Sequence, residues 1–173
     1  MTYNPVKFFT ATIQGWKPLL KPDKYKNIVT ESLKFLVEKK RIRLFGFVVM
    51  PNHLHLLWSM QDGIEEKDVQ RDFLKFTAQN IKFDLIKNHP KVLAHFRTSA
   101  KDREYQFWKR RAYASEMFNR QVVEQKLEYI HNNPLAKKWN LVQHPEDYFY
   151  SSARFYLLNI DDWGFLTHYY EHI

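Results

Sequence analysis

Two short apolar segments meet at a proline in the stretch Val48-Val49-Met50-Pro51-Asn52-His53-Leu54-His55-Leu56-Leu57-Trp58. Because proline lacks the N–H group that a sheet interior requires, Pro51 predicts a turn between two strands. Side chains of a strand alternate between its faces, so His53 and His55 share one face. Leu54 and Leu56 share the other face, which we expect to be buried. Two imidazoles on one rigid strand are typical of a metal-binding edge, although two ordinary histidines at the exposed end of a sheet remain an alternative.

The segments around this stretch predict the order β-α-β-β-α-β followed by a further helix. The predicted strands cover residues 7–13, 43–49, 54–59 and the end of 106–118, and the predicted helices cover 23–40, 64–88 and 120–132. This order is the split βαβ arrangement of a ferredoxin-like α+β fold. We expect an antiparallel sheet with the two long helices on one face, which leaves the other face for chemistry or a partner. Residues 91–104 predict a loop with a short helix.

The last predicted helix has recognisable signals at both ends. Asn119 is a favourable N-cap, and Phe118 with Val123 has the spacing of a hydrophobic staple. Pro134 ends the helix, because the residue before a proline avoids the α conformation. The length suits a single domain over residues 1–173, with a core at about 7–133 and an aromatic C-terminal extension at 134–173 that packs onto it.

Composition limits the classes of function that the chain can have. No cysteine is present, which excludes disulfides and thiolate metal sites. No run approaches the ~20 apolar residues of a membrane span, and the first residues lack the pattern of a signal peptide. We therefore expect a cytoplasmic protein without a membrane partner. The 27 lysines and arginines exceed the 19 aspartates and glutamates, which gives a net charge of +8.

Basic and aromatic residues occur together at two places in the second half of the chain. Lys109, Arg110 and Arg111 follow a Phe-Trp pair, and Lys137 with Lys138 precedes a tryptophan. Such charges attract phosphates, and unpaired bases stack on such rings. We expect these five residues to bind DNA, the alternative being a basic surface that is only solvated.

The last predicted helix carries a second set of polar residues. Tyr129 and Asn133 are four positions apart and therefore lie on one helical face. With the two histidines, the amide oxygen of Asn133 forms an uncharged, incomplete ligand set that leaves positions for phosphate oxygens and water. Tyr129 is the natural nucleophile for a phosphodiester, and the resulting phosphotyrosine conserves the bond energy for rejoining. Tyr113 is the second choice, and His131 points away from this face.

The motifs that carry these residues resemble those of a known family. They are Val49-Met50-Pro51-Asn52-His53-Leu54-His55-Leu56-Leu57, Trp108-Lys109-Arg110, Tyr129-Ile130-His131-Asn132-Asn133-Pro134 and Tyr150-Ser151-Ser152. In order and spacing the chain resembles the HUH single-tyrosine transposases, which are insertion-sequence-200-like enzymes, and in particular their REP-associated branch. The resemblance spans nearly the whole chain and implies a ferredoxin-like fold.

The resemblance also implies an activity. It implies Mg²⁺- or Mn²⁺-dependent cleavage and joining of single-stranded DNA through a 5′-phosphotyrosine and a free 3′-hydroxyl. His53 and His55 match the HUH histidines, Tyr129 matches the nucleophile, and Asn133 stands where the family places its third, polar ligand. The implied partners are single-stranded and hairpin DNA, in a bacterial protein that joins the nucleoid when bound. A homodimer stays open, since mobile members are typically dimers and REP-associated members can act as monomers.

One departure concerns the segment after the tyrosine helix. Relatives have a short Asn-Pro-x-x-x-Gly-Leu-Val run, whereas residues 133–142 are longer and lack glycine. The ligands are not affected, but the hairpin-binding surface need not match. Two other functions stay open at this point, namely a catalytically silent hairpin-binding protein on the same fold and a zinc hydrolase built on the two histidines. The second lacks an acidic third ligand near the motif.

Overall fold

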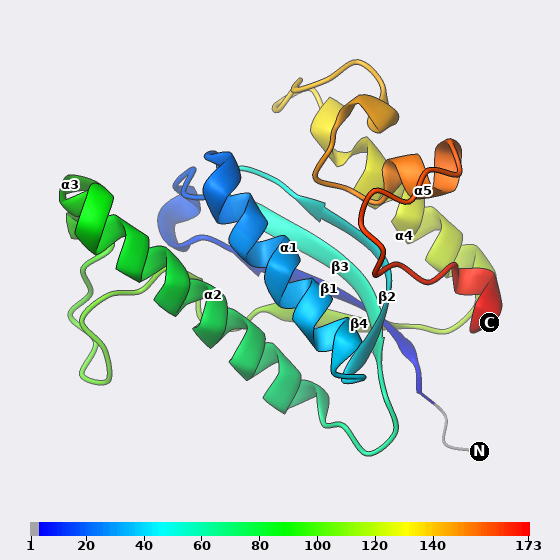
Figure 1. Ribbon diagram of the computed structural model, residues 1–173, viewed down its shortest axis with the longest axis horizontal. Coiled ribbons are helices and arrows are strands. Elements are labelled where there is room, and N and C mark those ends of the chain that lie inside the picture. Colours follow the sequence, from blue (N-terminus) through cyan, green and yellow to red (C-terminus); the bar gives the residue numbers. More distant parts are fainter. Residues whose placement is uncertain (1–3) are drawn as a thin grey trace.

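The computed structural model describes residues 4–173 and contains one sheet of four antiparallel strands (Figure 1). The strands are β1 (Val6–Thr12), β2 (Ile42–Val49), β3 (His53–Met60) and β4 (Tyr113–Met117). Their order across the sheet is β2-β3-β1-β4, so the first and third strands are central. This is the strand order of the ferredoxin-like arrangement, and the predicted fold class is confirmed. Residues 1–3 of the predicted domain lie outside the described part.

Two long helices cover one face of the sheet. They are α1 (Asp23–Glu38), which connects β1 to β2, and α2 (Glu66–Asn88), which follows β3 and is extended by the short helix α3 (Pro90–Ala94). The apolar stripes of both long helices pack against Leu54, Leu56 and Trp58 of β3 in one core. The period of two in β3 therefore places Leu54 and Leu56 in this core, and His53, His55 and Leu57 on the opposite face.

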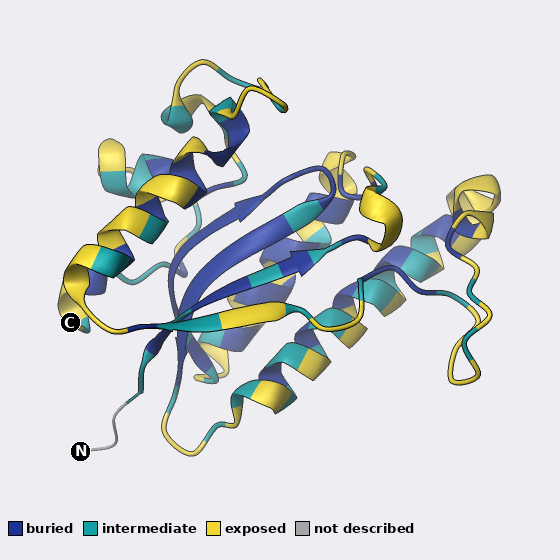
Figure 2. Ribbon diagram, turned by 180° about the vertical axis from the view of Figure 1, so that it is seen from behind, coloured by how far each residue is buried: buried dark blue, intermediate teal, exposed yellow. Residues whose placement is uncertain are grey.

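The second face of the sheet is mostly covered as well. Helix α4 (Arg120–Asn132) packs across β2 and β3, and Val123, Leu127 and Ile130 bury its apolar stripe in a second core. The expectation of an open second face therefore holds only near β4, which is exposed over part of its length (Figure 2). Tyr113 of this strand is 61% exposed. The histidine pair lies where the covered part of this face meets the open part.

The C-terminal segment closes the edge of the sheet at β2. Val49 N donates to Tyr150 O at 2.9 Å, and Ser152 N donates to Phe47 O at 3.0 Å. Tyr148 Oη also donates to Val49 O at 2.6 Å. Because an unpaired edge strand can pair with other chains, this cover removes a site of aggregation. The segment also contains the short helix α5 (Ala153–Leu157).

The start of α4 confirms one predicted signal and corrects another. The side chain of Asn119 accepts a hydrogen bond from Val122 N at 3.0 Å, as an N-cap does. The predicted staple is wrong, because Phe118 is 78% exposed while Val123 is fully buried. Phe118 follows the last residue of β4 and does not belong to the second core.

Candidate functional site

The two histidines of β3 lie between β1 and α4. In the register of the sheet His55 is opposite Thr10 of β1, and His53 is opposite Thr12. Their rings are 4.8 Å apart between centroids, and α4 places Tyr129 beside them. The structure therefore brings together residues that are about eighty positions apart in the chain.

His53 is held at both ring nitrogens. Its Nδ1 lies 2.7 Å from Asn52 Oδ1, and Asn52 in turn donates from Nδ2 to Trp16 O at 3.2 Å. The second bond fixes the orientation of the Asn52 amide, so Nδ1 of His53 is the donor of the first. The opposite nitrogen, Nε2, then presents a lone pair to Asn133 Oδ1 at 2.9 Å. Two acceptors at this distance are stabilised by a cation that both of them contact.

His55 has one satisfied and one unsatisfied nitrogen. The residue is 5% exposed, its Nδ1 lies 2.8 Å from Thr10 Oγ1, and its ring stacks on Phe8 at 5.2 Å between centroids. Nε2 is buried and has no hydrogen-bond partner. Because an unpaired buried polar atom costs about 1–3 kcal/mol, such an atom in a native core calls for an explanation. The burial also rules out an ordinary histidine at the exposed end of a sheet.

Both imidazoles are kept neutral by their surroundings. Burial lowers the pKa of His55 to about 3, and the neighbouring His53 and Lys126 act in the same direction. Burial also lowers the pKa of His53, and this is opposed by the Asn133 oxygen, which would accept a hydrogen bond from the protonated ring. A histidine must be neutral to ligate a metal ion, so the site is prepared for that role without a change of protonation.

The donor set fits a divalent cation. Two ligands in neighbouring octahedral positions at ~2.1 Å from Mg²⁺ are about 3 Å apart, close to the separation of His53 Nε2 from Asn133 Oδ1. The Nδ1 contacts supply the outer hydrogen bonds that orient ligating histidines. In the described chain no three residues of the types His, Cys, Asp and Glu gather to hold a metal. A metal held here would therefore rely on the amide of Asn133 and on a ligand from outside the protein.

Tyr129 stands at the solvent side of the histidine pair. It is 50% exposed, and its ring is 5.4 Å from that of His55 and 6.2 Å from that of Phe8 between centroids. Lys126, one turn earlier on α4, places Nζ 5.4 Å from the centre of the Tyr129 ring. A large substrate can therefore reach the phenol, and the Lys126 ammonium beside the ring supplies a countercharge for a phosphate of that substrate.

The other tyrosine considered from the sequence is less well placed. Tyr113 of β4 is opposite Thr10, which is itself opposite His55. Tyr113 therefore shares the histidine face but lies two strands away, roughly 10 Å across the sheet. His131 faces away from the site, as predicted, because it is buried and its Nε2 lies 2.8 Å from Ser152 Oγ.

The predicted basic residues fall on two sides of the site. Lys109, Arg110 and Arg111 line a cavity of about 550 Å³ that begins at Thr10, next to His55. Lys109 Nζ lies 3.4 Å over the ring of the exposed Trp16, whereas Arg110 is paired with an aspartate.

The second basic group lies after α4. Lys138 Nζ lies 5.4 Å from the ring centre of Trp139, and its charge contributes to the lowered pKa of His53. Trp139 in turn packs its ring 5.8 Å from that of His53. Lys137 is exposed. The segment that departs from the family pattern therefore borders the histidine pair.

Three supporting residues were missed in the sequence. Lys126 could have been found, because it precedes Tyr129 by three positions and therefore shares its helical face. Asn52 adjoins His53 but gave no signal beyond a turn. Thr10 is identified only by the register of two strands that are far apart in the chain.

Comparisons with known proteins identify solved structures that share the fold of this chain. No protein-family model and no curated protein sequence matches the chain. Among solved structures, the REP-associated tyrosine transposase bound to a REP hairpin has a TM-score of 0.64 at 17% identity, over 88% of this chain and 80% of that one. A protein of Deinococcus radiodurans R1 described as a transposase has a TM-score of 0.50 at 14% identity, over 76% of this chain and 92% of that one. At these identities the likeness shows a shared fold.

Proposed function

We propose that this protein cuts and rejoins single strands of DNA, with Tyr129 as nucleophile and Mg²⁺ or Mn²⁺ as cofactor. The observation that carries the proposal is the buried, unpartnered Nε2 of His55 beside the His53–Asn133 pair, with Tyr129 over it. The shared fold adds support, because one neighbour is a tyrosine transposase bound to a REP hairpin. Hairpin DNA is accordingly the proposed substrate.

The proposed step exchanges one phosphodiester for another. The Tyr129 oxygen attacks the phosphorus, the bond from phosphorus to the 3′ oxygen breaks, and a 5′-phosphotyrosine forms. The phenol gives up its proton and the departing 3′ oxygen takes one up, so no water or nucleotide is consumed. In the reverse direction a 3′-hydroxyl attacks the phosphotyrosine and restores a continuous strand. A divalent ion on His53, His55 and Asn133 would polarise the phosphate and stabilise the departing oxygen.

The remaining residues of the site orient the two histidines and supply positive charge. Thr10 and Asn52 fix the rings of the two histidines through their Nδ1 atoms. Lys126 Nζ lies 4.7 Å from the ring centre of Phe8 and 5.4 Å from that of Tyr129, so its charge would pair with a phosphate bound at Tyr129. Because a single chain assembles all of these groups, the proposed reaction does not require a second copy.

The experiment is a search for a covalent adduct. Fluorescent oligonucleotides, each an imperfect hairpin with single-stranded flanks of mixed sequence, are incubated with the protein and Mn²⁺ and resolved on denaturing gels. We expect a protein–DNA adduct that disappears with EDTA and with Tyr129→Phe. The matched control Tyr113→Phe removes the second tyrosine hydroxyl on this face and should retain the adduct.

Two outcomes contradict the proposal. Tight hairpin binding without an adduct at any flank sequence would indicate a DNA-binding protein that lacks the chemistry. Cleavage that persists in Tyr129→Phe would indicate a metal-bound water as nucleophile and a hydrolase.

None of the helices within residues 4–173 has the length and apolar character to cross a membrane.

A further inference from the structure

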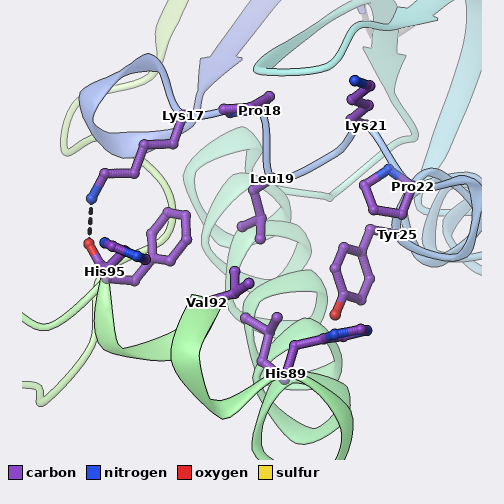
Figure 3. A pocket seen from close by; sticks show the side chains of 11 residues that line it. Lys17, Pro18, Leu19, Lys21, Pro22, Tyr25, His89, Val92 and His95 are labelled. Carbon is purple, nitrogen blue, oxygen red and sulfur yellow. Dashed lines mark hydrogen bonds between the residues drawn. The ribbon is translucent and has the colours of Figure 1, made fainter.

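A second cavity lies on the helical side of the sheet, away from the histidine pair. It has a volume of about 520 Å³ and is formed by the loop before α1, the end of α2 and the helix α3 (Figure 3). This volume is in the range of ligand-binding pockets. The backbone of this loop is attached to the turn between β2 and β3, since Leu20 N donates to Pro51 O at 2.9 Å. The cavity is therefore part of the folded frame and does not depend on the mobility of a free loop.

The interior of the cavity is hydrocarbon. Leu19, Leu85 and Phe96 are its most buried lining residues, between 0% and 5% exposed, and Pro18 and Pro22 add further carbon. The prolines have no N–H group to donate. A nucleobase would lose its hydrogen bonds to water here without replacement, which disfavours a flipped base as occupant. The chemistry favours an aliphatic or aromatic group.

The rim of the cavity is cationic. Lys17 and Lys21 stand at either side of the mouth, with Leu19 between them (Figure 3). Lys17 Nζ donates to the backbone oxygen of His95, and it lies 4.8 Å from the ring centre of Phe96. No aspartate or glutamate is among the lining residues.

Two carboxylates close to this cavity are already paired with lysines. Asp23, which follows the lining residue Pro22, lies 3.4 Å from Lys26 Nζ. Asp84 accepts a hydrogen bond from Tyr25 at 2.6 Å, and Lys24 pairs with it at 2.7 Å. Both bonds bring the pKa of Asp84 down to about 2, so the carboxylate stays charged and engaged. Neither carboxylate forms an ion pair with Lys17 or Lys21, so these two rim charges are left for a partner.

We propose that this cavity is a docking site for an acidic peptide segment of another protein, with one large apolar side chain inserted between the two lysines. The interior provides the kind of pocket in which an aromatic anchor carries most of the binding energy. The charges of Lys17 and Lys21 are separated by the mouth, so they suit several carboxylates along a chain better than the single head group of a small amphiphile. Complementary charge of this kind contributes mainly to the association rate and to specificity.

Binding is measured by fluorescence anisotropy with the intact protein. The probe is a ten-residue labelled peptide with four acidic residues around one tryptophan. In the first control peptide serine replaces the tryptophan, and in the second the acids become amides. We expect each control to bind at least roughly tenfold more weakly. Octanoate serves as a competitor that tests a small amphiphile as the occupant.

Two variants test the two parts of the site. Val92→Trp adds an indole from α3, where Val92 is 41% exposed, and should block the cavity with a loss of roughly tenfold or more. Lys21→Glu reverses one rim charge and should weaken binding by roughly threefold to tenfold, most strongly at low salt. Lys67→Glu makes the same charge change at an exposed position of α2 and should leave the affinity unaltered. Circular dichroism and the thermal midpoint verify the fold of each variant.

Several results would overturn the proposal. The first is equal affinity for the peptide and its serine control. The second is an equal loss of peptide affinity in Lys21→Glu and Lys67→Glu, and the third is unchanged peptide affinity in Val92→Trp. If octanoate binds and the acidic residues of the peptide make no difference, the occupant is a small amphiphile. These measurements use no DNA, so their outcome is independent of the reaction proposed for Tyr129.

Discussion

The contact between Gly46 of β2 and α4 sets the distance of the tyrosine helix from the sheet. A methyl group at Gly46 would lie 2.5 Å from Leu127 Cδ2 on α4. Carbon atoms in ordinary contact are roughly 3.5–4.0 Å apart, so Gly46→Ala requires a separation of about 1 Å. Because Leu127 is buried and belongs to the helix that carries Tyr129, the displacement should affect both stability and the site.

The magnitude follows from two opposed effects. Overpacking of this kind costs about 1–3 kcal/mol, and replacing glycine by alanine returns about 0.4–1 kcal/mol by restricting the unfolded chain. We expect Gly46→Ala to lower the free energy of unfolding by roughly 1–2 kcal/mol. Leu127→Ala, which empties the contact, should cost about 2–5 kcal/mol by itself. In the double variant the clash is absent, so the glycine substitution should become neutral or slightly stabilising.

The assay is a double-mutant cycle from urea denaturation of the wild type, both single variants and the double variant. We expect a coupling of about 1–3 kcal/mol in the direction of mutual rescue. Ser152 Oγ is the next atom, at 3.3 Å from the added methyl, and it is the same in all four proteins. If the two substitutions are additive within about 0.5 kcal/mol, Leu127 does not limit the approach of α4 and the reasoning is wrong.

Two further predictions concern the histidine support and the pairing of the long helices. Thr10→Val keeps the shape of the side chain but removes the partner of His55 Nδ1, and should raise the Mn²⁺ concentration for half-maximal adduct formation roughly tenfold or more, as read from a metal titration. The pKa of Asp84 is lowered to about 2 because Lys24 and Tyr25 donate hydrogen bonds to it. Since this pKa is lower in the folded than in the unfolded chain, the stabilisation is present above about pH 4 and is lost as the pH falls toward 2. The difference in urea midpoint between the wild type and Asp84→Asn should therefore shrink over that range, and a constant difference would contradict the assignment.

The sequence was most informative where one pattern had one structural solution. Apolar side chains with a period of two around a proline predicted the pair β2 and β3, and the helix 120–132 was predicted with the bounds that the structure has. Asn119 marks a helix start through its own side chain, so the signal is local. The predicted hydrophobic staple at Phe118 was wrong. A staple also needs a neighbouring surface that covers the apolar side chain, and Phe118 is left exposed.

The candidate site was predictable in its residues but not in its environment. His53, His55 and Tyr129 could be proposed from spacing, because strand and helix periods place them on defined faces. The burial of His55 Nε2 and the contact with Thr10 depend on a register between strands more than forty residues apart. The apolar cavity gave no signal at all, because it arises where three segments fail to fill the space between them.

The orientation of the tyrosine helix is fixed from the side that faces away from the site. His131 is two positions after Tyr129 and points in nearly the opposite direction around the helix axis. Its Nε2 lies 2.8 Å from Ser152 Oγ, and the same oxygen accepts a hydrogen bond from Phe47 N of β2 at 3.0 Å. A rotation of α4 that moved Tyr129 off the histidine pair would break this buried connection and leave polar groups unpaired. The C-terminal segment therefore contributes to the proposed chemistry without approaching the substrate, because it holds the helix at the rotation that the nucleophile needs.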